Sequence, residues 1–309
     1  MSDKAIQIEG LNKTYRAGGK SPAKNALKDV DLDIPRGSIF GLLGPNGAGK
    51  STIINIMGGM VVKSSGTIRI WGNDLDKQTR EAKKSIGIVP QEINFDPFFT
   101  PAQMLDIQAG LYGVARKDRR TEELLDLVGL TEKADSYARS LSGGMRRRLM
   151  IAKAMVHDPP ILVLDEPTAG VDIELRRRLW RNVRDLNKKG TTILLTTHYL
   201  EEAEELCDRI AIINNGRIIA DEEKESLLGR IDSKLINFRL DRPIEEIPGE
   251  LKKFSAELKG RRSLVLRYSP ADTEIGSIIE IIQKKGYGIA DISTDDSDLE
   301  DVFLQLTRD

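Results

Sequence analysis

Residues 44–52 read GPNGAGKST, a glycine-rich run in which Lys50 and Ser51 directly follow the last glycine. Such glycines let backbone N–H groups wrap the phosphates of a nucleotide, while the lysine reaches the β- and γ-phosphates as a point charge. The Ser51 hydroxyl is expected to bind Mg²⁺, with Thr52 beside it near the α-phosphate. The residues expected to hold a nucleotide here are Gly44, Pro45, Asn46, Gly47, Ala48, Gly49, Lys50, Ser51 and Thr52.

A second glycine turn, LSGGM at residues 141–145, opens a predicted helix. Backbone N–H groups at a helix N-terminus can hold a phosphate, so Ser142, Gly143 and Gly144 form a second predicted anion site. A nucleotide has only one terminal phosphate. We therefore expect the second site to face the nucleotide of another subunit.

Two adjacent carboxylates, Asp165 and Glu166, follow the apolar run ILVL. Carboxylates beside a buried strand cost desolvation free energy unless a cation or a proton compensates. Asp165 is therefore expected to hold Mg²⁺ through its water shell, and Glu166 to orient or deprotonate an attacking water as a general base. The alternative, acidic residues at a helix N-terminus, does not explain the buried strand before them.

The elements around these residues must bring them to one edge of a sheet. SIFGLLG, ILVLDEP and TTILLTTH are apolar runs that end in polar residues or glycine. Such runs are typical of central parallel strands, whose carboxyl ends build an active site. SIFGLLG leads into the glycine loop and the chain is predicted to be helical from Ser51, the order that a phosphate loop requires. The sequence therefore predicts an α/β fold.

Other segments predict the rest of this fold. Alternating AIQIE and VDLDI are expected to form an antiparallel sheet, and TIRIWG and SIGIVPQ are expected to be short strands. Residues 101–130 have a helical pattern. His198 closes TTILLTTH, where its imidazole could contact a γ-phosphate, whereas His157 is interpreted as structural.

In their order, these motifs resemble those of the ATP-binding cassette (ABC) family, over residues 1–230. LSGGM, EPTAGVDIELRR and the C-terminal LEDVFLQLT are similar to the ATP-binding subunits of bacterial ABC-2 type exporters, whose permease is a separate membrane protein. The resemblance implies an ABC-type P-loop NTPase fold with an antiparallel β subdomain and a helical subdomain. It also implies that the chain binds and hydrolyses ATP with Mg²⁺.

The resemblance assigns further roles. His198 matches the histidine that senses the γ-phosphate, and Gln91 matches a glutamine whose amide touches Mg²⁺ and the attacking water. Asp172 matches a loop that crosses the dimer interface. Tyr15 falls where the family stacks an aromatic ring on adenine, an interaction worth roughly 1–3 kcal/mol, although it could equally be a packing residue at a strand end.

The chain departs from the family at Met145, where a glutamine is usual. Methionine cannot donate a hydrogen bond. Ser142 and the backbone donors after it are unchanged, so the resemblance still implies that they bind the γ-phosphate held by the opposite subunit.

The stretch INFDPFFT, residues 93–100, places three phenylalanines after Gln91. They could pack locally. In the family this region receives a short helix of the membrane partner, and we favour a docking surface because exposed apolar patches usually mark interfaces.

The composition excludes some functions. With a formal net charge of −1, no bulk basic field favours nucleic acid or an anionic membrane surface. The basic runs 146–148 and 176–178 are interpreted as solvated helix faces or as contacts with a dimer or membrane partner. The single cysteine suits a reducing cytoplasm, and no signal peptide or membrane span is evident, so a transport channel must lie in another polypeptide.

The expected domains are a cassette at residues 1–230 and a small α+β accessory domain at 231–309. In the second, RLDRPIEEIPGE is predicted to be a connection, and SLVLRY, IGSIIEIIQKKG and YGIADIS a strand, a helix and a strand. Ser297 and Glu300 have the spacing of a capping box that opens a last helix. Dimer support and regulation are both open as roles for this domain.

The resemblance implies that two subunits, expected to be a homodimer, close head to tail on two Mg·ATP molecules. Hydrolysis would reopen the dimer, and an integral membrane permease bound to it would convert this opening and closing into transport. The expected location is the cytoplasmic face of the inner membrane, held peripherally. Two alternatives remain: a soluble ATPase clamp acting on a ribosome, DNA or an assembly scaffold, and the ATPase of an importer. No nucleic-acid partner is expected.

Overall fold

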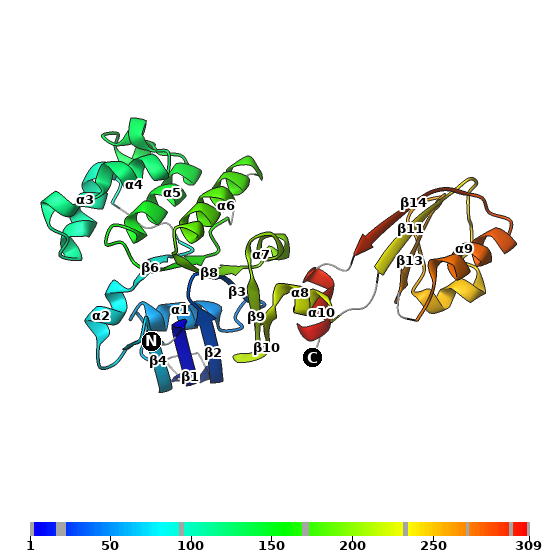
Figure 1. Cartoon of the computed structure of the whole chain (residues 1–309), viewed down its shortest axis with the longest axis horizontal. Helices are drawn as coiled ribbons and strands as arrows, with labels where there is room; N and C mark the ends of the chain where they lie inside the picture. Colours follow the sequence, from blue (N-terminus) through cyan, green and yellow to red (C-terminus); the bar gives the residue numbers. More distant parts are fainter. Residues whose placement is uncertain are drawn as a thin grey trace. The chain divides into compact units, whose positions relative to one another are not determined.

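The protein is represented by a computed structural model that describes residues 3–16, 23–92, 96–168, 173–230, 234–269, 272–296 and 299–307. Its contacts divide the chain into two compact units, Met1–Lys224 and Glu225–Asp309, both drawn in Figure 1. In the described parts of the chain, no helix combines the length and apolar composition needed to cross a membrane.

A six-stranded sheet forms the centre of the first unit, in the order β10-β9-β3-β8-β7-β6. The central pairs β9–β3, β3–β8, β8–β7 and β7–β6 are parallel, and β10 is antiparallel to β9. Every residue of β3, β7 and β8 is buried, as expected for strands covered on both faces. The bounds are β3 Ile39–Leu43, β6 Ile86–Val89, β7 Ile161–Asp165, β8 Thr192–Thr197, β9 Arg209–Asn214 and β10 Arg217–Glu223.

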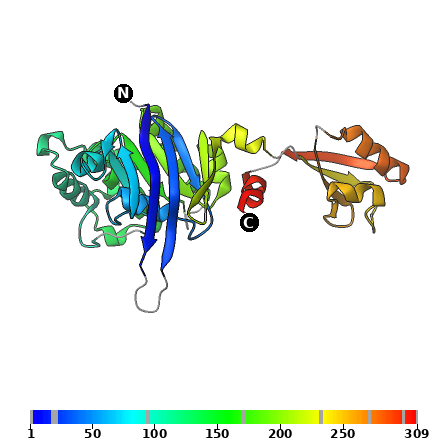
Figure 2. The ribbon, with the colours of Figure 1, turned by 90° about the horizontal axis from the view of Figure 1, so that it is seen from below.

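A second, antiparallel sheet of the first unit has the order β2-β1-β4-β5, and its long hairpin β1–β2 is clear in Figure 2. One apolar core contains Ile6 of this sheet, Phe40 of the central sheet and Ile53 of α1, so the two sheets and α1 pack together. The bounds are β1 Lys4–Tyr15, β2 Lys24–Pro35, β4 Ser65–Ile70, β5 Asn73–Asp74 and α1 Lys50–Met57.

Helices complete the first unit, and α3, α4 and α5 pack on one another as a helical region (Figure 1). The first of these, α3, begins where the sequence dictates, because Thr100 and Gln103 form a capping box and Pro101 occupies the first turn. The bounds are α2 Thr79–Lys84, α3 Pro101–Leu111, α4 Thr121–Leu127, α5 Gly143–Ala154, α6 Ile173–Lys188, α7 Leu200–Leu206, and the 3₁₀ turns η1 Arg116–Asp118, η2 Thr131–Lys133 and η3 Ala138–Ser140.

The second unit has a four-stranded antiparallel sheet, in the order β12-β13-β11-β14. Alternate residues of β13, namely Leu264, Leu266 and Tyr268, are buried and share an apolar core with Ile278 of α9. The bounds are α8 Lys224–Leu228, β11 Lys234–Leu240, η4 Gly249–Phe254, β12 Glu257–Leu258, β13 Ser263–Tyr268, α9 Ile275–Lys284, β14 Ile289–Asp296 and α10 Leu299–Thr307.

The α/β fold with an antiparallel sheet and a helical region is confirmed, as are the strands and helices named from the sequence. The prediction of a plain connection at residues 239–250 is wrong in part. Leu240 ends β11 and, with Ile244, is buried in the core of the second unit, because these apolar side chains point inward from an otherwise charged segment. Ser297 of the expected capping box lies outside the described residues.

Candidate functional site

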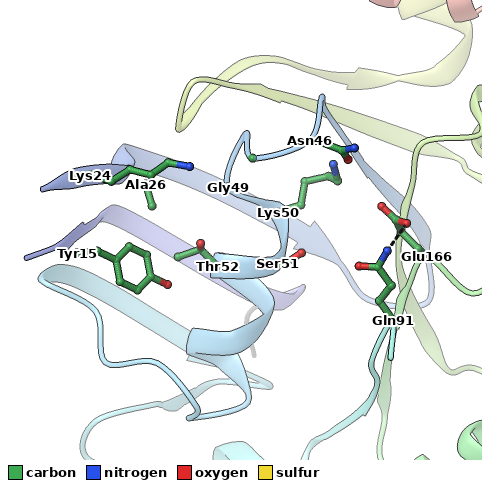
Figure 3. A pocket seen from close by; sticks show the side chains of 11 residues that line it. Tyr15, Lys24, Ala26, Asn46, Gly49, Lys50, Ser51, Thr52, Gln91 and Glu166 are labelled. Carbon is green, nitrogen blue, oxygen red and sulfur yellow. Dashed lines mark hydrogen bonds between the residues drawn. The ribbon is translucent and has the colours of Figure 1, made fainter. Parts of the chain in front are cut away.

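A pocket of about 420 Å³ lies where the glycine loop joins β3 to α1. It draws side chains from β1, β2, the loop, α1 and the ends of β6 and β7, so residues far apart in the chain meet here (Figure 3). Its lining residues are Tyr15, Lys24, Ala26, Asn46, Gly47, Gly49, Lys50, Ser51, Thr52, Gln91 and Glu166.

The glycine loop has a backbone that only glycine adopts easily. Gly47 and Gly49 have φ of 80° and 125°, in a region that side chains disfavour. A Cβ at Gly44 would lie 2.2 Å from the carbonyl oxygen of Ile213, which allows no side chain there. The loop is therefore built around its glycines.

Lys50 points along this loop and donates to the carbonyl oxygens of Gly44 and Pro45, at 2.6 and 3.3 Å from Nζ. Burial lowers the pKa of the Lys50 ammonium, and the nearby carboxylates of Glu166 and Asp165 oppose this effect. A buried cation beside two carboxylates suits the binding of an anion and a metal together.

Glu166 connects two of the residues that the sequence proposed for catalysis. Its Oε2 accepts a hydrogen bond from Gln91 Nε2 at 2.8 Å, drawn in Figure 3, and lies 3.3 Å from His198 Nδ1. The Glu166 side chain is 10% exposed and that of His198 is 45% exposed, so the carboxylate sits at the inner end of this group. The arrangement could hold a water molecule against a substrate.

Asp165, at the end of β7, accepts a hydrogen bond from Thr196 Oγ1 at 2.5 Å. Burial raises the pKa of this carboxyl, while the Thr196 hydrogen bond opposes the shift. Thr196 also accepts from the backbone N–H of Glu166, through its carbonyl at 2.9 Å and its hydroxyl at 3.2 Å. The sequence analysis missed Thr196, although its position at the polar end of an apolar strand resembles that of Asp165.

The oxygen donors around the pocket fit a small divalent cation such as Mg²⁺. Ser51 and Gln91 line the pocket, and Asp165 adjoins Glu166 beside it. In the described part of the chain, no cluster of three or more His, Cys, Asp or Glu side chains is placed to hold a metal ion. A Mg²⁺ ion held by Ser51, Gln91 and Asp165 would take its other ligands from water and substrate phosphates, as this cation usually does.

The second glycine turn lies elsewhere. Ser142 is the N-cap of α5, and its Oγ accepts from Met145 N at 3.3 Å. Ser142 and Gly143 are exposed, and Gly144 is half-buried. Of the described residues that line the pocket, none belongs to this turn. Asp172 is outside the described residues.

Tyr15 lies at the outer end of the pocket, 39% exposed, with Lys13 Nζ 4.8 Å from its ring centroid. Lys24 and Ala26 of β2 lie near it and were not proposed from the sequence (Figure 3). Nothing local distinguishes these two residues, since they reach the site only through the pairing of β2 with β1.

The interpretation of residues 146–148 as a solvated face is wrong for two of the three arginines. Arg147 and Arg148 are 4% and 8% exposed. Both guanidinium groups turn inward from α5 and donate to backbone carbonyls, although the buried Nε of Arg148 has no hydrogen-bond partner. In the other run, Arg177 and Arg178 are exposed, in accord with the sequence analysis, and Arg176 is half-buried.

A second cavity of about 340 Å³ is lined by residues of β6, α3 and α5 and by Met60, which follows α1. Exposed apolar side chains occur after α1, before α3 and on α3. We call these residues, Met60, Val62, Phe98, Ile107 and Leu111, the α3 surface; they are 66%, 81%, 67%, 47% and 77% exposed. The cavity itself is lined by Met60 and also by Pro90, the residue before Gln91. Phe95 lies outside the described residues.

His157 has a structural environment. Its ring stacks on Tyr112 at 3.7 Å between centroids, and its Nε2 lies 3.3 Å from the carbonyl oxygen of Ile86. Burial lowers the pKa of His157. It is not one of the residues that line the pocket at the glycine loop.

Comparison with known proteins shows which family this chain resembles. The family model described as "ABC transporter" matches residues 27–169. The linearmycin resistance ATP-binding protein of Bacillus subtilis is 42% identical over 233 residues, covering 75% of this chain and 73% of that protein. A Nod factor export ATP-binding protein I of a Rhizobium species is 36% identical over 310 residues, covering 99% of this chain and 98% of that protein.

Solved structures of similar fold are also ATP-binding subunits or cassettes. An ATP-binding subunit of an ABC transporter aligns with a TM-score of 0.65 and 30% identity, over 73% of this chain and 92% of the other. A dimeric ATP-binding cassette in a post-hydrolysis state, bound to ADP and Pi, aligns with a TM-score of 0.63 and 28% identity, over 71% and 98%.

The fold and the pocket define an ATP-binding cassette ATPase. The chain belongs to the ABC transporter family, and its relatives include ATP-binding proteins of linearmycin resistance and of Nod factor export.

Proposed function

We propose that this chain is the ATP-hydrolysing subunit of an ABC exporter and powers a separate membrane permease from the cytoplasmic face of the membrane. The observation that carries the proposal is the position of the second cavity, which is lined by Met60 of the α3 surface and by Pro90. The residue after Pro90, Gln91, hydrogen-bonds to Glu166. A partner that binds at this cavity would thus contact the residue next to Gln91, and Gln91 contacts Glu166, the proposed general base.

Within the nucleotide pocket, the loop N–H groups and Lys50 would bind the phosphates and Tyr15 would stack on the base. Ser51, Gln91 and Asp165 would hold Mg²⁺, which when bound supplies charge neutralisation of the phosphates. Glu166 would take a proton from the attacking water, with Gln91 and His198 orienting it.

The site is proposed to be completed by a second copy of the chain. Ser142 and Gly143 are exposed at the N-terminus of α5, outside the pocket, so they are free to meet the γ-phosphate held by a second copy. Asp172 would lie at the same interface. Binding two ATP would favour closure and hydrolysis would remove the bridging phosphate, because a ligand shifts an equilibrium only by its differential contacts.

Export rather than import is favoured by the relatives, whose names assign them to Nod factor export and linearmycin resistance. We also propose that residues 231–309 are an accessory domain of this exporter subunit. One Nod factor export protein aligns over 99% of this chain, so its similarity includes this region.

The test is co-purification of the tagged Glu166→Gln chain with Mg·ATP from detergent-solubilised cells. A polytopic membrane protein should co-purify in stoichiometric amount. The same pull-down with Leu111→Asp added should lose it, because a charge on the α3 surface opposes an apolar contact. Ile292→Asp, which changes an exposed apolar residue of the second unit, is the matched control and should keep it.

Ribosomes, nucleic acid or soluble scaffold proteins in place of a membrane protein would overturn the exporter function. Equal loss with Leu111→Asp and Ile292→Asp would overturn the docking surface. ATP hydrolysis by the parent chain is measured separately and does not depend on either result.

A further inference from the structure

Arg147 is buried in the middle of the first unit, with 4% of its surface exposed. It lies on α5, the helix that Ser142 caps. Taking a guanidinium out of water is costly unless its N–H groups find acceptors. Burial indeed lowers the pKa of Arg147, against the charges of Asp165, Glu166 and Glu202.

The acceptors are three backbone carbonyls from two segments outside α5. Nη1 donates to the oxygens of Pro90 and Gln91 at 2.8 and 2.9 Å, and Nη2 donates to the oxygen of Glu166 at 2.9 Å. One side chain thereby joins α5 to both residues whose side chains meet at the inner end of the pocket.

The hydrogen bond to Glu166 acts on an unusual backbone. Glu166 has φ of 48°, in the left-handed region that non-glycine residues rarely adopt. Its N–H donates to the Thr196 carbonyl at 2.9 Å and its own carbonyl accepts from Arg147, so both peptide groups that flank its Cα are fixed. These contacts determine where its carboxylate points, and Figure 3 shows it facing Gln91.

We propose that Arg147 is a positioning residue for ATP hydrolysis. Its guanidinium fixes the backbones of Gln91 and Glu166 so that the amide and the carboxylate meet, and it links their spacing to the position of α5. A shift of α5 when Ser142 engages a phosphate would therefore act directly on the hydrolytic pair. The inference rests on the proposed roles of Glu166 and Gln91.

The chemistry requires arginine. The planar guanidinium presents donors in a fixed fork, and here they reach carbonyls of two separate segments. Lysine has a single ammonium on a flexible stem and cannot reproduce both directions at once. A lysine should therefore restore only part of the function.

The next residue provides a matched control. Arg148 is also buried, at 8% exposure, but it donates to the carbonyls of Val128 and Gly129 after α4, within the helical region. Replacing it should disturb α5 packing to a similar degree without touching Gln91 or Glu166. A comparison of the two arginines separates positioning from plain structural support.

The experiment uses the purified full-length chain and measures kcat and KM for Mg·ATP, with rates expressed per nucleotide-binding-competent molecule. We expect Arg147→Met to lower kcat about 30- to 100-fold, the scale of an ångström misplacement, with KM within about twofold. Arg147→Lys should fall between parent and Arg147→Met. Arg148→Met should keep kcat within about threefold.

A double variant gives a second readout that structural damage would not imitate. If Arg147 acts through Glu166, adding Arg147→Met to Glu166→Gln should lower the residual rate by less than about threefold, because the two changes remove one function. If Arg147→Met does not fold, the same comparison is made with Arg147→Lys.

The outcomes separate the inference from the proposed function. A parental rate in Glu166→Gln would remove the general base itself. An inactive Glu166→Gln with a parental kcat in Arg147→Met would overturn the role of Arg147 alone. Equal losses in the Arg147 and Arg148 variants, or full additivity in the double variant, would reduce Arg147 to structural support.

Discussion

The two units of this chain bury different kinds of side chain. Within the residues that the structure describes, all buried polar and charged residues lie in the first unit. Five of them, Lys50, Arg147, Asp165, Glu166 and Glu202, carry charged groups near the carboxyl ends of the central strands. In the described part of the second unit, the buried residues are all hydrophobic.

This difference shows in which unit folding stability alone explains the buried residues. Apolar burial is favourable in itself, so the second unit needs no reason beyond its own stability. Burying an ion costs roughly several kcal/mol even after the surrounding protein relaxes. A buried charge is therefore retained only where a partner or a function compensates for this cost. The buried charges of the first unit therefore mark the part of the fold that is organised for chemistry.

The largest expected effect removes one charge from the first unit. Glu166→Gln keeps the size of the side chain and its contact with Gln91 but cannot accept a proton. We expect kcat for ATP to fall about 10²- to 10⁴-fold while ATP binding is retained, and the chain to accumulate as an ATP-bound dimer. Steady-state hydrolysis and size-exclusion chromatography with Mg·ATP measure both.

The control is Glu205→Gln, which changes an exposed carboxylate on α7 and should leave kcat unchanged within about twofold. Hydrolysis by Glu166→Gln at the parental rate would remove the link between buried charge and chemistry.

The second prediction concerns the apolar unit. Phe238 is fully buried in β11, and Phe238→Ala should destabilise the second unit by about 3–5 kcal/mol through lost burial and the cavity left behind. ATP hydrolysis should stay within about twofold of the parent, because the buried charges of the other unit are untouched. Hydrogen exchange of the β11 and β13 amides measures the first effect and a coupled ATPase assay the second.

A matched Ile292→Ala variant, at a residue 41% exposed, should change stability by less than about 0.5–1 kcal/mol. Loss of hydrolysis in Phe238→Ala would show that the second unit shares in the chemistry, contrary to the comparison.

The sequence predicted the features that local pattern encodes. Buried strands such as β3 and β7 are continuous apolar runs, and the glycine loop between strand and helix specifies its own backbone. These features depend on few residues at short separation, so one sequence suffices to find them.

Features made by tertiary packing were missed. Arg147 sits in a basic run that looks solvated, and only the packing of α5 against Gln91 and Glu166 buries it. Ile244 lies in a charged, proline-containing segment, yet it enters a core formed by distant strands and helices. The roles assigned to the site residues, including Asp172, stay predictions.

The smallest expected effect tests the cost of a buried charge directly. Glu202 on α7 is fully buried and accepts from Trp180 Nε1 at 2.9 Å and Thr168 Oγ1 at 3.2 Å. Burial raises its pKa above the ordinary value of 4.5, while hydrogen bonds from Thr197, Trp180 and Thr168 oppose the shift. The folded protein therefore holds this proton more tightly than the unfolded chain.

Below pH 4.5, Glu202 is protonated in both states and its ionisation costs no stability. As pH rises from there, the unfolded chain ionises first, so stability falls until pH has passed the raised folded pKa. Glu202→Gln cannot titrate. Its free energy of unfolding minus that of the parent should therefore increase with pH across this window, by at most about 1.4 kcal/mol per pH unit, and then level off.

Urea unfolding of both proteins at several pH values measures this difference, and Glu201→Gln, an exposed neighbour on α7, should show no such trend. A difference that decreases with rising pH would mean that the hydrogen bonds from Thr168 and Trp180 outweigh desolvation. Glu202 would then be a stabilising ion, and the contrast between the two units would reflect satisfied hydrogen bonding rather than the cost of burying charge.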